Sequence, residues 1–178
     1  MEQVGENSLE ALRAQAAELS AQVIDTCRER GWTLATAESL TAGMLAACIA
    51  DTPGASAVLR GGLVVYATDL KATLAGVDQE LLHKRGPVDP AVAVQLSKGA
   101  AQRCGASIGI GLTGVAGPDG QDGHSVGEVH IGMTVPAGAG GTTVRTLDLG
   151  TRPRAVIRQL AVNGALEMIL GIAGDGNK

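Results

Sequence analysis

The segment Thr33-Leu-Ala-Thr-Ala-Glu-Ser-Leu-Thr-Ala-Gly43 decides the fold of this chain. Its small and apolar residues up to Ala37 predict a short buried strand, and the apolar run 44–50 predicts a helix. The polar turn between them places Ser39 where a strand ends and a helix begins. Backbone N–H groups are free at such a junction, and α/β proteins bind ligands there. Ser39 is therefore either the N-cap of the helix or a nucleophile beside an oxyanion site.

Helical and strand-like segments alternate along the rest of the chain. This order predicts one three-layer α/β/α domain over residues 1–178, with a mixed, mostly parallel sheet and frayed ends at 1–6 and 174–178. Thr68 or Asp69 is expected to cap the third helix, and Gly61-Gly62 to mark a bulge or a close backbone approach. The expected helices are 8–30, 44–50, 70–74, 78–84, 90–104 and 154–172, and the expected strands are 33–37, 58–67, 106–112, 126–135 and 142–149.

Charge and aromatic content argue against several classes of function. The formal net charge is −4, and Lys and Arg form no cluster longer than two residues, which disfavours binding to a phosphate backbone. Trp32 and Tyr66 are the only aromatic residues, so the chain offers no stacking platform for single strands. We therefore expect no nucleic-acid partner.

The three cysteines and the apolar segments bear on location. Cys27, Cys48 and Cys104 are odd in number and lie in apolar runs, as expected of reduced residues in a cytoplasmic protein. We expect no signal peptide and no apolar stretch long enough to span a bilayer, so no membrane partner is predicted.

The histidines and one glycine-rich loop are the candidates for a metal or a phosphate. His130 and Glu128 could share one strand face, but no third ligand is evident, so we expect neither metal nor cofactor. The loop that follows Thr113 lacks the Gly-Lys-Ser/Thr ending of a P-loop. It is either a tight turn or a wall of backbone N–H donors beside a ligand.

Lys71 is placed where a cation is unfavourable. It falls in the first turn of the expected helix 70–74, where the macrodipole disfavours positive charge. Lys71 is either a solvated surface residue or a cleft residue whose pKa is lowered by burial and by the dipole, as a general base requires. Tyr66 precedes it by five residues and is either an ordinary strand residue or part of the same site.

Three ordered blocks resemble the CinA C-terminal domain family, over about residues 8–172. The blocks are Ala37-Glu-Ser-Leu-Thr-Ala-Gly43, Arg60-Gly-Gly-Leu-Val-Val-Tyr-Ala-Thr-Asp-Leu-Lys71 and Thr113-Gly-Val-Ala-Gly-Pro-Asp119. Enzymatic members of this family are nicotinamide-nucleotide amidohydrolases of the PncC type. Full-length members carry an additional N-terminal domain, so this chain resembles the stand-alone form.

The resemblance implies a catalytic assignment for each block. Ser39 maps to the nucleophile and Lys71 to its base, with Tyr66 beside it, and no metal is needed. Arg154 and Arg158 match the family's arginine pattern and would hold the substrate phosphate, although both could instead form a solvated helix face. The implied substrate-binding residues are Glu38, Thr41, Gly43, Thr113, Gly114, Ala116, Gly117, Arg154 and Arg158.

Two departures from the family pattern concern substrate binding. Leu40-Thr-Ala-Gly43 replaces a common Cys-Thr-Gly-Gly, and the methyl group of Ala42 could narrow the pocket. The segment Gly150-Thr-Arg-Pro-Arg154 leaves open whether Arg152 or Arg154 matches the family arginine. Neither departure removes the Ser39–Lys71 pair.

The resemblance thus implies a cytoplasmic, homo-oligomeric deamidase of nicotinamide mononucleotide (NMN), whose partner is a small-molecule nucleotide substrate. The alternative is a CinA-like domain that binds a ligand or a protein partner without turnover, linked to competence or DNA damage. Ammonia release from NMN, compared with Ser39→Ala, distinguishes the two.

Overall fold

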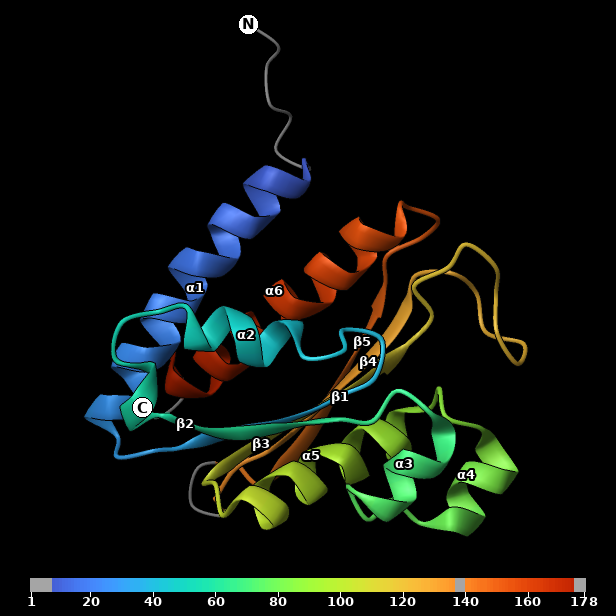
Figure 1. The fold of residues 1–178 in the computed structure, drawn as a ribbon, viewed down its shortest axis with the longest axis horizontal. Coiled ribbons are helices and arrows are strands. Elements are labelled where there is room, and N and C mark those ends of the chain that lie inside the picture. Colours follow the sequence, from blue (N-terminus) through green and yellow to red (C-terminus); the bar gives the residue numbers. More distant parts are fainter. Residues whose placement is uncertain (1–7, 137–139, 175–178) are drawn as a thin grey trace, which may run out of the picture.

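The computed structural model describes residues 8–136 and 140–174, which form a sheet covered by helices on both faces (Figure 1). The predicted frayed ends lie outside this range, except for Gly174, which is the last residue of a helix. The expected three-layer α/β/α domain is confirmed.

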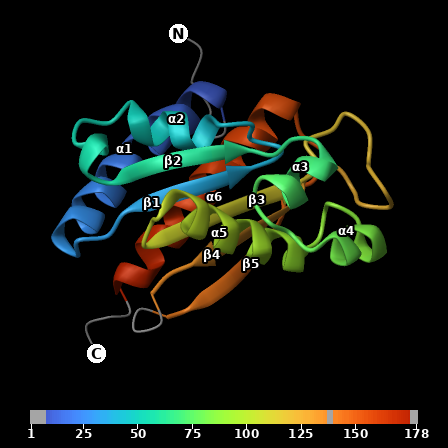
Figure 2. The ribbon, with the colours of Figure 1, turned by 60° about the horizontal axis from the view of Figure 1, so that its bottom comes forward.

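The described residues form a five-stranded sheet with the order β2-β1-β3-β4-β5 (Figure 2). Strand β1 (Leu34–Glu38) pairs in parallel with β2 (Leu59–Val64) and with β3 (Ile108–Gly114). Strand β4 (Glu128–Thr134) runs antiparallel to β3 and to β5 (Thr142–Asp148). The expected mixed sheet is confirmed, and it has a parallel half at β2-β1-β3 and an antiparallel half at β3-β4-β5.

The helices divide between the two faces of the sheet. Helices α1 (Leu9–Glu29), α2 (Met44–Ala50) and α6 (Arg154–Gly174) cover one face, whereas α3 (Thr68–Thr73), α4 (Gln79–Arg85) and α5 (Pro90–Cys104) lie on the other (Figures 1 and 2). A 3₁₀ turn at Ala55–Ala57 precedes β2. The larger apolar cluster fills the space under α1, α2 and α6, and a smaller one lies under α5.

Glycines in β3 and β4 allow α5 to approach the sheet closely. A Cβ atom at Gly109 would lie 1.9 Å from the Ser97 carbonyl oxygen, and one at Gly132 would lie 2.1 Å from that of Ala93. No real side chain tolerates such distances, so only glycine permits this backbone packing. The Gly-Ile-Gly pattern of β3 is therefore a consequence of how α5 docks.

The start of α3 differs from the prediction. The helix begins at Thr68, and its N-cap is Ala67, which makes no side-chain cap. The expectation that Thr68 or Asp69 caps the helix was wrong, because both residues lie within the first turn of the helix itself. Lys71 consequently lies in the last turn of α3 and not in the first. The bulge predicted near Gly61 is present, since Leu34 pairs with Leu59 and Ala35 with Gly61.

Helix α6 corrects a second expectation. Its segment Arg154–Ile172 is long and apolar enough to cross a membrane by length and composition. Half of these residues are buried within the domain, where α6 packs against α1 and the sheet. Because the core helix of a globular domain shows the same features, this finding is weak evidence for a membrane.

Candidate active site

A pocket of about 170 Å³ opens where β1 and β3 end and where α3 and α6 begin. Ligands bind outside the carboxyl ends of strands in open α/β sheets, so the position agrees with the general rule. Residues from five segments of the chain that are far apart in sequence line it: Ser39, Leu40, Tyr66, Thr68, Lys71, Pro87, Val88, Thr113, Gly114, Val115, Ala116, Gly117, Asp119, Gln121 and Arg154.

Ser39 lies in this wall and does not cap α2. The N-cap of α2 is Gly43, which makes no side-chain cap, so the N-cap interpretation of Ser39 was wrong. The Ser39 N–H donates to the Leu112 carbonyl at 3.0 Å, which fixes the residue against the end of β3. The Ser39 side chain therefore remains available to the pocket.

Lys71 lines the same pocket and contacts Ser39. Its side chain is 1% exposed, and Nζ lies 3.0 Å from Ser39 Oγ, 2.9 Å from the Val65 carbonyl oxygen and 3.3 Å from that of Tyr66. A neutral amine has two N–H bonds and one lone pair. When the two carbonyls accept the two N–H bonds, the lone pair points to the Ser39 hydroxyl, which then becomes the donor.

Burial explains how Lys71 becomes neutral. Desolvation lowers the pKa of Lys71 from 10.5 to about 8, although the nearby Asp69 carboxylate opposes this shift. The macrodipole explanation offered from the sequence was wrong, because Lys71 lies in the last turn of α3. With a pKa near 8, about a tenth of the amine is unprotonated at pH 7, far more than at the ordinary value of 10.5, which suits a general base.

Tyr66 and Arg154 form the outer part of the pocket. Arg154 Nη2 donates to the Tyr66 hydroxyl at 2.7 Å, and Nη1 donates to the Gly117 carbonyl at 2.6 Å. Tyr66 follows β2 and is 55% exposed, so its ring faces solvent at the rim. Arg154 thereby joins the Tyr66 segment to the loop after β3.

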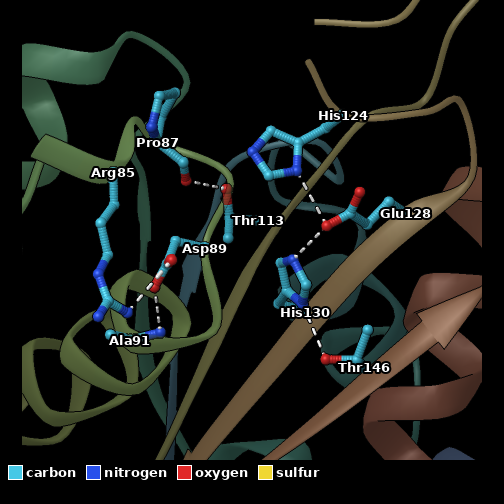
Figure 3. A network of polar contacts seen from close by, with 9 residues as sticks. All are labelled: Arg85, Pro87, Asp89, Ala91, Thr113, His124, Glu128, His130 and Thr146. Atoms are coloured by element: carbon cyan, nitrogen blue, oxygen red, sulfur yellow. Dashed lines mark hydrogen bonds and ion pairs between the residues drawn. The ribbon is translucent and has the colours of Figure 1, made fainter. Parts of the chain in front are cut away.

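The loop after β3 presents backbone donors to the pocket. The Thr113 hydroxyl donates to the Pro87 carbonyl at 2.6 Å and fixes the start of the loop (Figure 3). The N–H groups of Ala116 and Gly117 have no hydrogen-bond partner within residues 8–136 and 140–174. Both residues line the pocket, which supports the interpretation of this loop as a wall of donors.

A histidine pair holds the base of the same loop. Glu128 Oε1 lies 2.9 Å from His124 Nδ1 and 3.0 Å from His130 Nε2, and His130 Nδ1 lies 2.9 Å from Thr146 Oγ1 (Figure 3). Partial burial raises the pKa of Glu128, but the combined influence of His124 and His130 outweighs it, so the pKa is lowered. In the part of the chain that the structure describes, no three His, Cys, Asp or Glu residues are arranged to hold a metal ion.

The structure brings some predicted site residues to the pocket and leaves others outside. Thr113, Gly114, Ala116, Gly117 and Arg154 join Ser39, Lys71 and Tyr66 in the pocket wall. Outside the wall are Glu38, Thr41, Gly43 and Arg158. Glu38 and Arg158 hydrogen-bond to the backbone of the turn after β1, whereas the buried Thr41 hydroxyl has no hydrogen-bond partner among the described residues. Gly43 has no side chain, so none of the four offers a side chain to a substrate in this pocket.

The residues affected by the family departures also lie outside the pocket wall. Ala42 is exposed, with a φ of 51°, so its methyl group does not narrow the pocket. Arg152 donates to the Leu149 carbonyl at 2.7 Å and does not line the pocket, which leaves Arg154 as the arginine of this wall.

Sequence reasoning missed several residues of the pocket wall. Asp119 is the last residue of the third family block, and this position could have marked it as a residue of the site. Thr68, Pro87, Val88 and Gln121 carry no local signal, because only the folding of α3 and of the two loops brings them to the pocket.

Comparisons with known proteins agree with this geometry. A model of the CinA C-terminal domain matches residues 16–173. The chain belongs to the CinA C-terminal domain family. Among solved CinA-type structures, competence/damage inducible protein CihA from Agrobacterium tumefaciens has a TM-score of 0.84 at 33% identity, covering 89% of this chain and 95% of that one. ComA from Klebsiella pneumoniae has a TM-score of 0.85 at 29% identity, with coverage of 91% and 99%.

Curated relatives carry the CinA domain within longer chains. A CinA-like protein of Frankia casuarinae is 45% identical over 152 residues, which is 85% of this chain and 34% of that protein. A putative competence-damage inducible protein of Streptococcus uberis is 39% identical over 151 residues, 85% of this chain and 35% of that one. The chain thus spans about a third of the length of these relatives.

Proposed function

We propose that this CinA domain is an amidohydrolase that deamidates NMN through Ser39 and Lys71. One observation carries the proposal: a buried lysine lies 3.0 Å from a serine hydroxyl in the wall of a pocket, and burial lowers its pKa to about 8. A serine becomes nucleophilic when an adjacent base accepts its proton, and Lys71 is such a base. This pair needs no metal ion to activate its nucleophile.

In the first step, Ser39 Oγ attacks the carboxamide carbon of the nicotinamide while its proton passes to Lys71 Nζ. The tetrahedral intermediate collapses when the new Lys71 ammonium protonates the amide nitrogen, so that the C–N bond breaks and ammonia leaves. The result is a nicotinoyl ester on Ser39, with Lys71 neutral again.

In the second step, water attacks the ester carbonyl while Lys71 accepts its proton. Collapse of this second intermediate breaks the bond to Ser39 Oγ, which takes back the proton from Lys71 and leaves nicotinate mononucleotide. The carbonyls of Val65 and Tyr66 support both steps, because they hold the two amine hydrogens and keep the lone pair directed at Ser39.

Backbone N–H groups supply the oxyanion site. Leu40, Ala116 and Gly117 line the pocket, and their N–H groups have no hydrogen-bond partner among the described residues. Donors that are already in place stabilise a developing oxyanion without reorganisation. The three residues come from two segments of the pocket wall, the turn after β1 and the loop after β3, so their free N–H groups are candidates to bind an oxyanion formed next to Ser39.

The charges of the pocket complement NMN, which carries a cationic pyridinium ring and an anionic phosphate. Arg154 offers the guanidinium for the phosphate. Asp119 lines the same pocket and makes no hydrogen bond or ion pair with any residue that the structure describes. Its free carboxylate suits the positive ring.

Ammonia release from NMN tests the proposal, with Ser39→Ala as the key variant. We expect the wild type to release ammonia and Ser39→Ala to lose at least about 1,000-fold in kcat. Ser125→Ala is the matched control, because Ser125 is exposed and outside the pocket. Equal ammonia release by wild type and Ser39→Ala would overturn the nucleophile, and no release by the wild type would favour the domain that binds without turnover.

A further inference from the structure

Glu38 occupies the N-terminus of α2, where the sequence predicted a site for ligand anions. The residue is fully buried, and its carboxylate accepts hydrogen bonds from the N–H groups of Gly43, Leu45 and Ala46 at 2.9–3.0 Å. A fourth bond comes from the Thr36 hydroxyl at 2.9 Å. The carboxylate therefore takes the first free donors of the helix, so a substrate anion has no place there.

Arg158 of α6 holds the same turn through its carbonyl groups. Its Nε donates to the Leu40 carbonyl at 2.8 Å, and its Nη2 donates to the Thr41 carbonyl at 2.9 Å. The guanidinium comes from the first turns of α6 and lies outside the pocket wall. An arginine used in this way binds the backbone of the turn and not a phosphate.

Glu38 and Arg158 hold the turn that contains Ser39, and part of the backbone of this turn has an unfavourable conformation. Ala42 and Gly43 both have positive φ, 51° and 94°, and such conformations cost free energy in a non-glycine residue. The Ala42 N–H donates to the Ser39 carbonyl at 3.0 Å. Because a peptide unit is planar and trans, this bond also sets the direction of the Leu40 N–H, the proposed oxyanion donor.

We propose that Glu38 and Arg158, together the turn clamp, are positioning residues that hold Ser39 Oγ and the Leu40 N–H in reactive geometry. The charged groups act through the backbone and touch no substrate atom. The inference rests on the proposed function only in taking Ser39 as the nucleophile. A nucleophile displaced by about 1 Å loses about 100-fold in rate, so a loosened clamp affects kcat and not substrate affinity.

The test compares Arg158→Met, Arg158→Lys and Glu38→Gln with Arg145→Met as the matched control. Arg145 also attaches a guanidinium to α6, through Glu167 at 3.2 Å, but it lies far from the turn in sequence and outside the pocket wall. The first readout is the rate at which a fluorophosphonate labels Ser39, because Oγ displaces fluoride from phosphorus without any amide substrate. The second readout is kcat and KM for NMN, and the third is the thermal midpoint.

We expect Arg158→Met to slow both labelling and kcat by about 10- to 100-fold, with KM changed less than about threefold. Arg158→Lys should recover part of the rate, since an ammonium can donate to one of the two carbonyls. Glu38→Gln, which keeps the shape but loses the charge, should slow labelling about tenfold. Arg145→Met should label at the wild-type rate.

Two results would overturn the turn clamp. One is that the fluorophosphonate labels Arg158→Met at the wild-type rate at a temperature where the variant is fully folded. That result would make Arg158 purely structural. The other is a KM for NMN raised more than about tenfold with kcat and labelling unchanged, which would make Arg158 a phosphate ligand. If the wild type is labelled at Ser39 but does not deamidate NMN, the proposed substrate fails, and the labelling rates still decide the clamp.

Discussion

Two walls of the pocket differ in how far their polar groups are satisfied. At the end of β1, the carboxylate of Glu38 and the guanidinium of Arg158 lie outside the pocket wall and bind most backbone donors and acceptors of the turn that carries Ser39. At the end of β3, the N–H groups of Ala116 and Gly117 and the carboxylate of Asp119 have no partner among the described residues. The first wall therefore fixes the position of the reacting Ser39, whereas the second wall has free polar groups that can bind a ligand.

This difference divides the expected effects of mutation. Changes at the first wall should lower kcat, because they alter the reacting pair or its position. Changes at the second wall should alter KM and the choice of substrate, because its free groups gain partners only when a ligand binds. Changes near either wall that touch neither set should affect stability alone.

The largest effect is expected from Lys71→Met, which removes the base of the first wall. We expect kcat for NMN to fall at least about 1,000-fold. In the wild type, kcat should rise with pH and level off above about 8, because only the neutral amine accepts the Ser39 proton. Lys98→Met, on the exposed face of α5, is the control and should keep both kcat and the pH profile.

The same substitution changes how stability depends on pH. The folded-state pKa of Lys71 is about 8 and the ordinary value is 10.5, so between these pH values the unfolded chain binds more protons. Burial of the charged amine therefore destabilises the wild type below pH 8, and this penalty disappears as the pH rises to 10.5. Denaturant unfolding measures this effect. As the pH rises from 8 to 10.5, the free energy of unfolding of the wild type should increase by up to about 3 kcal/mol relative to that of Lys71→Met. If the difference in free energy of unfolding between the wild type and Lys71→Met did not change with pH, Lys71 would not be buried.

A smaller effect is expected from Asp119→Asn at the second wall. Loss of the carboxylate should lower kcat/KM for NMN about fivefold, or about 1 kcal/mol. The reduced mononucleotide, whose ring is neutral, should show no such loss. Asp25→Asn, on the exposed face of α1, is the control for net charge. An equal loss of kcat/KM with both nucleotides would show that Asp119 does not interact with the positive charge of the ring.

The smallest effect is expected from Ala42→Gly, which lies beside the first wall but outside the pocket. Its φ of 51° favours glycine, so we expect the free energy of unfolding to rise by about 0.5–1 kcal/mol with kcat unchanged. Ala47→Gly, in the middle of α2, is the matched control and should lower the free energy of unfolding by about 1 kcal/mol. A loss of stability in Ala42→Gly would contradict the assignment of strain to this turn.

Much of the fold and part of the site could be predicted from the sequence, since they depend on local patterns. Apolar periodicity located α1, α5 and α6. Asp89 followed by Pro90 is a local signal for the start of α5, and in the structure Asp89 Oδ1 accepts from the Ala91 N–H at 2.7 Å. The spacing of Tyr66 and Lys71 drew attention to that segment. The start of α3 was missed because its cap uses no side chain.

The sequence by itself determined the order of the elements and the chemical types available to the pocket, because periodicity and residue identity are local properties. Only the tertiary structure decided which of those groups meet. Arg154 and Arg158 lie one helical turn apart on α6, yet one reaches the pocket and the other binds the turn after β1. Burial against Val65 and Ser39, contributed by other segments, gives Lys71 its lowered pKa. Desolvation and hydrogen bonding depend on neighbours in space, and neighbours in sequence do not specify them.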